Sequence, residues 1–185
     1  MDKFGKSQPV KRVEDLRFLT GMGRYLDDAA PKDALRGVVF RSPVAHAVIT
    51  GLDVAAARAA DGVHAVLTVE DLEAAGMNIN MRATTVKNRD GSQGAAPRRP
   101  MLAKGRVRYV GEPVAFIVAE TLEQARDAAE MIVFDYEDLP VKLDLAPGGE
   151  TVHSEAPDNR AFDWGMGDEA ATEAAFKAAA RTVSL

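Results

Sequence analysis

The sequence predicts an α/β (α+β) fold in which helices cover a mixed sheet. Short apolar runs typical of strands alternate with Ala-rich segments typical of helices, in the order strand–helix–strand–helix and then strand–strand–helix–strand. Hydrophobic residues make up 46% and charged residues 28% of the chain, as in an average globular protein. At 185 residues the chain is long enough to bury one ordinary core, with or without an appended piece.

The first half of the predicted domain holds two strand–helix pairs. Pro43 ends the first apolar run, because proline removes a donor from the ladder of a sheet. Thr50 and Asp53 are possible caps of the first helix, and Thr68 with Asp71 resembles a capping box for the second. The expected elements are a strand over 35–41, a helix over 52–60, a strand over 63–68 and a helix over 68–76.

The second half contains the strongest helix signal in the chain. Thr121 and Gln124 form a capping box, and the apolar residues that follow keep one stripe at helical spacing. The run 114–119 is apolar throughout, which is typical of a strand at the centre of a sheet. The expected elements are a strand over 105–109, a turn at 111–113, a strand over 114–119, a helix over 121–132 and a strand over 133–137.

Three segments lack this regularity. Residues 1–34 are mostly polar and predict an extended arm that lies on something larger. Residues 78–100 show no periodicity and are rich in Gly and Pro, which predicts a mobile or functional loop. Residues 149–185 hold a Pro- and Gly-containing connector, an Ala-rich helix from about 168 to 180 and the beginning of a strand. We therefore expect the folded domain to occupy residues 35–148.

Composition excludes several classes of protein. The chain has no cysteine, so it forms no disulfide and offers no thiolate to zinc or to an iron–sulfur cluster. No two of the three histidines stand at metal-ligand spacing. The net charge of -5 and the pI near 5.3 disfavour binding to nucleic acid. No apolar run is long enough to span a membrane, and the amino terminus shows no secretory signal, so we expect a cytoplasmic protein.

Three phrases of the sequence carry a resemblance to a known family. They are KRVEDLRFLTG at 11–21, RVRYVGEPVA at 106–115 and VFDYEDLP at 133–140. In this order they resemble the large subunit of the molybdenum hydroxylases, the xanthine dehydrogenase and aldehyde oxidase family, and most of all the carbon monoxide dehydrogenase branch. The resemblance implies an α/β-hammerhead domain for residues 35–148. It also implies that residues 149–185 are a linker and the truncated start of the family's molybdopterin-binding domain.

The segment RSPVAHA at 41–47 matches a family signature and contains the first candidate site residue, His46. His46 could act as a metal ligand or general base, or its two ring nitrogens could bond to backbone and fix a loop. We favour the structural role, because no second ligand stands nearby at metal spacing. His64 alternates to the outer face of a predicted strand, and we expect it to be exposed to solvent.

Glu112 lies between Gly111 and Pro113 and could be a catalytic carboxylate or part of a tight turn. The family resemblance favours the turn, because many relatives carry a glutamine here and an amide cannot replace a general base. Three other carboxylates, Asp135, Glu137 and Asp138, could form an acid–base set or a calcium site. Their strand alternation and the absence of EF-hand spacing favour a solvated strand face.

The remaining motifs are weak. Gly21-Met22-Gly23 lacks the third glycine and the preceding strand of a dinucleotide fingerprint. The pair Arg98-Arg99 could hold an anion or a partner, or could simply be exposed in a loop. Because no phosphate loop and no nucleophile elbow is present, a small acyl or phosphate enzyme has no motif to support it.

The resemblance implies that the intact protein oxidises its substrate at molybdenum carried by a molybdopterin of the cytosine dinucleotide type. Iron–sulfur clusters and FAD would lie on partner subunits. The family's cofactor loops and catalytic glutamate have no counterpart in these residues, so we predict no catalytic, cofactor-binding or metal-binding residue in this chain and no activity for the chain alone.

We therefore expect this chain to be the structural amino-terminal domain of a large subunit. Its partners would be the downstream molybdopterin domains and the iron–sulfur and flavin subunits, and the isolated chain could self-associate. The alternative is a self-standing hammerhead module that serves as an adaptor or assembly partner. The emerging strand at 182–185 favours the first hypothesis. Nothing in these residues specifies the substrate, which in the family ranges from carbon monoxide to purines, aldehydes and N-heterocycles.

Overall fold

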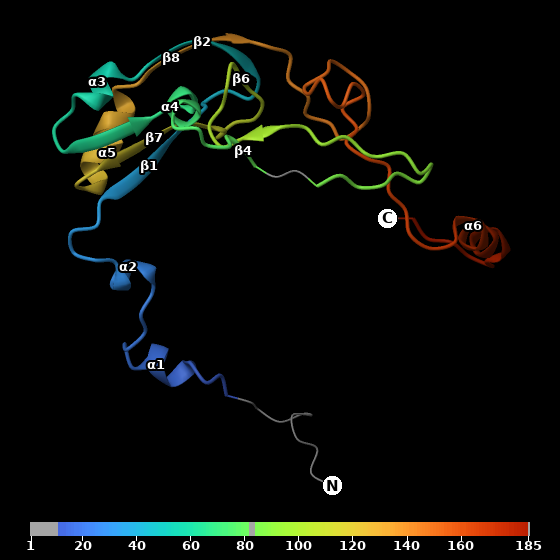
Figure 1. Ribbon diagram of the computed structural model, residues 1–185. Helices are drawn as coiled ribbons and strands as arrows, with labels where there is room; N and C mark the ends of the chain where they lie inside the picture. The colour runs from blue at the N-terminus through green and yellow to red at the C-terminus, as the bar shows by residue number, and fades with distance from the viewer. Residues whose placement is uncertain (1–10, 82–83, 185) are drawn as a thin grey trace.

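The computed structural model describes residues 11–81 and 84–184, and the body of the molecule is built on two small antiparallel sheets (Figure 1). Sheet A has the strand order β1-β7-β3, and sheet B has the order β6-β2-β8. A two-stranded ladder, β4-β5, lies beyond them. The strands are β1 (Arg36–Arg41), β2 (Ala47–Asp53), β3 (Val63–Leu67), β4 (Asn80–Met81), β5 (Arg99–Pro100), β6 (Arg106–Val107), β7 (Pro113–Ala119) and β8 (Val133–Asp138).

Some of the short helices cover sheet A, and others lie in the two end segments of the chain. Helices α3 and α5 pack against sheet A, while α1 and α2 lie in the arm and α6 lies in the tail, away from the body (Figure 1). The helices are α1 (Asp15–Leu19), α2 (Leu26–Ala29), α3 (Ala55–Arg58), α4 (Val69–Ala74), α5 (Leu122–Glu130) and α6 (Glu169–Ala178). Within the described residues, no helix combines the length and the apolar character needed to cross a membrane.

Strand β7 is the centre of the fold because it pairs with both β1 and β3 and contributes buried residues to both hydrophobic clusters. Ala115 and Ile117 face α5, where they pack with Ala125 and Ala128 in the main hydrophobic cluster. Val114, on the other face, belongs to a second cluster with residues of β2 and β6. Phe40 and Leu52 contact both clusters, so the two sheets share a continuous apolar interior.

The predicted α/β fold with covering helices is confirmed, and so are its best local signals. The Thr121 hydroxyl accepts the Gln124 N–H, and the Gln124 side chain accepts the Thr121 N–H, which is the predicted capping box. Thr68 and Asp71 cap α4 in the same way. Within the described residues the strands pair antiparallel throughout and divide into separate sheets, whereas the sequence predicted one mixed sheet.

Three local predictions are wrong. The helix expected over 52–60 is reduced to α3, and the residues before it form β2, because pairing with β8 and β6 provides more hydrogen bonds than a short isolated helix turn. The strand expected at the end of the chain is absent from residues 181–184, which have no pairing partner among the described residues. Of the arm, residues 11–34 contain two short helices where an extended segment was expected, and residues 1–10 lie outside the described part.

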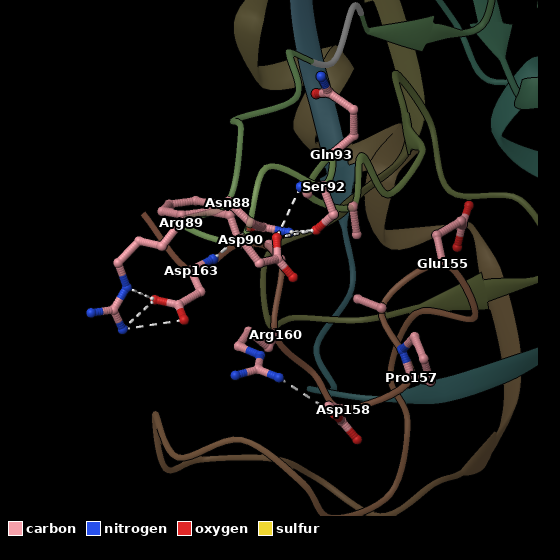
Figure 2. Close-up of a pocket in the computed structure, with 15 residues that line it drawn as sticks. Asn88, Arg89, Asp90, Ser92, Gln93, Glu155, Pro157, Asp158, Arg160 and Asp163 are labelled. Carbon is pink, nitrogen blue, oxygen red and sulfur yellow. Dashed lines mark hydrogen bonds and ion pairs between the residues drawn. The ribbon is translucent and has the colours of Figure 1, made fainter. Parts of the chain in front are cut away.

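The loop predicted over 78–100 is held by the tail (Figure 2). The Arg89 N–H donates to the Asp163 carbonyl at 2.9 Å, and the Ala95 N–H donates to the Ala161 carbonyl at 2.7 Å. The Arg89 guanidinium also pairs with the Asp163 carboxylate at 2.9 Å. At Gly94 a side chain would place a Cβ only 2.8 Å from the Ala161 carbonyl oxygen, so the two segments approach too closely for any other residue.

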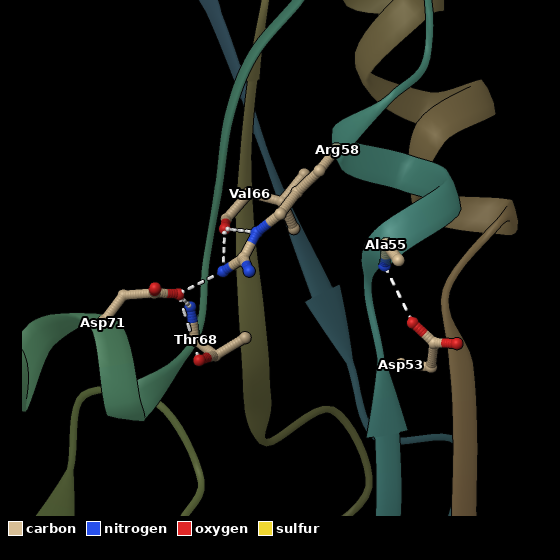
Figure 3. A network of polar contacts seen from close by, with 6 residues as sticks. All are labelled: Asp53, Ala55, Arg58, Val66, Thr68 and Asp71. Carbon is tan, nitrogen blue, oxygen red and sulfur yellow. Dashed lines mark hydrogen bonds and ion pairs between the residues drawn. The ribbon is translucent and has the colours of Figure 1, made fainter.

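A polar network connects helices α3 and α4 to strand β3 at the edge of sheet A (Figure 3). The Arg58 guanidinium donates to the Val66 carbonyl and lies 2.6 Å from the Asp71 carboxylate. The Thr68 N–H, the Thr68 hydroxyl and the Arg58 guanidinium together lower the pKa of Asp71, against a smaller effect of burial. This network links α3, β3 and the start of α4.

Candidate functional site

The two loops singled out from the sequence meet in a buried contact at one end of sheet A. The Ser42 N–H donates to the Glu112 carbonyl at 2.9 Å, and the Gly111 N–H donates back to the Ser42 carbonyl at 2.8 Å. The Arg41 guanidinium donates to the Gly111 carbonyl at 2.9 Å. Because Ser42 and Glu112 are both buried, the two backbone hydrogen bonds between them are shielded from water and hold the 41–47 loop onto the turn before β7, whereas the Arg41 bond is exposed.

His46 is buried in this contact, with 3% of its surface exposed. Its Nδ1 lies 2.7 Å from the Pro140 carbonyl oxygen, and a carbonyl only accepts, so Nδ1 carries a proton and donates it to this hydrogen bond. Nε2 is buried and has no hydrogen-bond partner among the described residues. We had expected both ring nitrogens to bond to backbone, and the structure confirms this for Nδ1 alone.

Glu112 lies in the predicted turn, but the burial of its side chain was not predicted. Gly111 has a φ of +87°, and the Glu112 N–H donates to the Tyr109 carbonyl at 3.2 Å, which confirms the tight turn. The side chain is only 4% exposed, and its carboxylate accepts the Arg108 N–H. Burial raises the pKa of Glu112, and the Arg108 N–H and guanidinium partly oppose this.

Arg108 connects this cluster to the connector that follows β8. Its Nε is buried without a hydrogen-bond partner among the described residues. Burial lowers the pKa of His153, and the nearby Arg108 charge lowers it further. Arg108 and His153 line a cleft of about 410 Å³ together with Arg98, Lys104 and Glu155. Arg98 of the predicted Arg98-Arg99 pair thus lines this cleft, whereas Arg99 lies in β5.

The chemistry available to this cluster is limited by access. A buried imidazole near a buried carboxylate is a combination of groups that general acid–base catalysis can use. However, a general base has to come within hydrogen-bond reach of its substrate, and His46 Nε2 is enclosed by protein. The cluster therefore serves to tie three segments together, namely the 41–47 loop, the 108–112 turn and the 139–155 connector.

The other candidate residues stay apart from this cluster. His64 is exposed, as predicted, and lies 3.6 Å from Glu120. Asp135 and Glu137 are exposed on β8, which confirms the solvated strand face. Gly21-Met22-Gly23 follows α1 in the arm. The part of the chain that the structure describes contains no group of three or more His, Cys, Asp or Glu placed to hold a metal ion.

Large apolar side chains are exposed on the arm and the tail. Their exposed fractions range from 40% for Phe18 to 90% for Leu26. Phe18 stacks on Tyr25 with ring centroids 5.7 Å apart, so these two rings cover each other in part. These exposed residues are Phe18, Leu19, Tyr25 and Leu26 in the arm and Phe162, Trp164 and Phe176 in the tail, while Phe4 lies outside the described residues.

Comparison with known families decides what this fold is. Residues 20–140 match the family described as aldehyde oxidase and xanthine dehydrogenase, a/b hammerhead domain. This range contains all the strands of both sheets. The chain belongs to the aldehyde oxidase and xanthine dehydrogenase family. Its body is the α/β-hammerhead domain of that family, as the sequence resemblance implied.

Curated relatives of this chain are much longer than the chain itself. The chain is 42% identical to the nicotine 6-hydroxylase large subunit of Paenarthrobacter nicotinovorans over 81% of its own length and 18% of the relative. It is 35% identical to the carbon monoxide dehydrogenase large chain of Afipia carboxidovorans, over 90% of its own length and 21% of the relative. The chain thus spans about a fifth of the length of these curated relatives.

Solved structures of the aldehyde oxidase and xanthine dehydrogenase family agree with this fold. Carbon monoxide dehydrogenase from Oligotropha carboxidovorans gives a TM-score of 0.72 at 34% identity and covers 93% of this chain and 22% of its own. Quinoline 2-oxidoreductase from Pseudomonas putida 86 gives a TM-score of 0.63 at 40% identity and covers 71% of this chain and 16% of its own.

Proposed function

We propose that this chain is the amino-terminal structural domain of a molybdopterin-dependent hydroxylase large subunit of the carbon monoxide dehydrogenase type, without a catalytic centre of its own. The observation that carries the proposal is the match of residues 20–140 to the hammerhead domain in relatives that are about five times longer. The reaction, the substrate and the cofactors would then belong to the other four-fifths of such a protein and its partner subunits.

The chemistry of the described residues supports assigning the cofactor elsewhere. A molybdopterin dinucleotide needs backbone or cationic groups around its phosphates, and iron–sulfur clusters need thiolates. The chain has no cysteine. Its buried histidine and carboxylate are occupied in joining loops. The chain offers no thiolate to an iron–sulfur cluster, and we propose that the molybdopterin, the iron–sulfur clusters and the FAD are held by other domains and subunits.

The exposed apolar residues of the arm and tail support an architectural role. Five aromatic side chains there, those of Phe18, Tyr25, Phe162, Trp164 and Phe176, are 40–67% exposed. Exposed apolar groups of this number are typical of a surface that another domain covers. We therefore propose that residues 11–34 and 149–184 lie against the molybdopterin domains, with residues 35–148 as the folded unit between them.

Co-elution with the remainder of a large subunit tests this proposal. The carbon monoxide dehydrogenase large chain, produced without the fifth that this chain matches, should form a stable complex with the 185-residue chain on gel filtration. Leu19→Ser/Leu26→Ser should weaken the complex, because both side chains are more than four-fifths exposed in the isolated chain. The matched control is Leu145→Ser, an equally exposed leucine outside the arm.

Failure of the wild-type chain to bind, together with a strictly monomeric state, would instead support the self-standing adaptor module. The coding sequence that follows Leu185 offers an independent test, because the proposal predicts that it encodes molybdopterin-domain motifs.

A further inference from the structure

Strand β8 forms an open edge of sheet B. It pairs with β2 along Val133–Asp138, and the sheet order β6-β2-β8 leaves its other side without a strand among the described residues (Figure 1). At six residues it is long enough to template a further strand, whereas β6, at the opposite edge of the same sheet, has only two.

The hydrogen bonds around β2 show which backbone groups face this open edge. The Leu139 N–H donates to the His46 carbonyl at 2.9 Å, so residue 139 directs its backbone toward β2. The Ile49 N–H, opposite Tyr136, donates away from β8 to the Gly105 carbonyl at 3.0 Å. Since residues of an antiparallel strand alternate in direction, Tyr136 and Asp138 present their N–H and C=O groups to the open side.

The side chains of β8 carry charge of one sign only. Asp135, Glu137 and Asp138 are exposed, and none of them takes part in an ion pair or side-chain hydrogen bond among the described residues. The strand contains no Lys, Arg or Pro. Val133, at the start of the strand, and Tyr136, between two of the carboxylates, are 52% and 38% exposed, which leaves apolar surface that an added strand would cover.

This charge decides which kind of strand fits. A second copy of β8 would place carboxylates opposite carboxylates, and like charges directly opposite each other destabilise a strand pair. A segment with Lys or Arg at alternate positions would instead face Asp135 and Glu137, which lie two residues apart on the same face of the strand.

We propose that the β8 edge binds an extended, basic segment of another polypeptide by strand addition. The backbone groups of Tyr136 and Asp138 form the hydrogen-bond ladder with this segment, and Asp135 and Glu137 pair with its Lys or Arg side chains. This interaction depends only on the geometry of sheet B and is independent of the hydroxylase assignment.

The test uses the full-length chain and two synthetic peptides of about seven residues that alternate Val and Lys. One peptide has an ordinary backbone and the other is N-methylated at alternate residues, which keeps its charge and removes its capacity for strand addition. Calorimetry should show binding of the ordinary peptide and at least about 10-fold weaker binding of the methylated one. Amide hydrogen exchange at Tyr136 and Asp138 should slow by about 10-fold or more when the ordinary peptide binds.

A pair of charge variants locates the site. Asp135→Lys/Glu137→Lys should weaken binding by at least about 10-fold, whereas Glu123→Lys/Asp127→Lys, which makes the same charge change on exposed positions of α5, should have little effect. Equal binding of the two peptides would reduce the interaction to general charge attraction and overturn the proposal. Absence of binding, or protection of amides away from β8, would overturn it as well.

Discussion

Truncation of Ile117 to alanine should cost more stability than any comparable change in the chain, because Ile117 is fully buried in the central strand β7. The change removes three carbon atoms, worth about 0.8 kcal/mol each, or about 2.4 kcal/mol of lost transfer free energy. A residual cavity of up to roughly 80 Å³ adds up to about 2 kcal/mol at about 24 cal/mol per Å³. We expect Ile117→Ala to lower the free energy of unfolding by about 2.5–4.5 kcal/mol.

Urea denaturation followed by far-ultraviolet circular dichroism measures this loss. Tryptophan fluorescence is unsuitable, because the single tryptophan, Trp164, is 56% exposed in the tail and does not report on the core. The matched control is Val118→Ala on the opposite face of the same strand, which is partly exposed and should cost less than about 1.5 kcal/mol. A loss below about 1 kcal/mol for Ile117→Ala, or equal losses for both variants, would refute the assignment of β7 as the core strand.

Three further changes test the buried cluster and the tail. His46→Ala should cost about 1–2 kcal/mol, because it removes the hydrogen bond to the Pro140 carbonyl, and an unchanged melting temperature would contradict this. Glu112→Gln should be more stable than wild type at neutral pH. Burial raises the pKa of Glu112 above 4.5. The stability that the protonated side chain contributes to the folded state is therefore fully present below that pH, and it is lost as pH rises through the folded-state pKa. In melting curves, the stability gain of Glu112→Gln over wild type should disappear by about pH 4. A wild type that is more stable than the variant at every pH would show that the contact with Arg108 outweighs the cost of burying the carboxylate. Arg89→Ala should speed tryptic cleavage within residues 84–100, because the ion pair with Asp163 that holds this loop is lost, and cleavage first in the body would argue against it.

Local signals in the sequence predicted most elements of the body. The capping pairs Thr121–Gln124 and Thr68–Asp71 work through contacts three residues apart, so their patterns are visible in the chain itself. The apolar run of β7 can likewise be seen in the sequence alone. Strand β2 was missed because its pattern is interrupted. Its register shifts between Ile49 and Gly51, which places Thr50 in a bulge, and an Ala-rich segment follows.

The candidate site depended on contacts that no local pattern contains. The 41–47 loop and the turn at Glu112 are joined by backbone hydrogen bonds across about 70 residues of sequence, as the Arg41 contact with Gly111 shows. The turn was predicted from Gly111, but the burial of the Glu112 carboxylate results from packing of these two segments. The attachment of the long loop to the tail through Arg89 and Asp163 likewise joins segments that are far apart in the chain.

We propose that this chain supports a hydroxylase without supplying a catalytic residue, and the turnover number of a reconstituted complex measures whether it supplies one. The truncated carbon monoxide dehydrogenase large chain, with its partner subunits, would be saturated with wild-type chain or with the His46→Ala or Glu112→Gln variant. These two side chains are the buried titratable groups closest to a catalytic arrangement. We expect that wild-type chain restores carbon monoxide oxidation and that saturating amounts of each variant give the same kcat, with changes confined to the concentration of chain required. A fall in kcat of about 10-fold or more in a complex that is intact on gel filtration would contradict it.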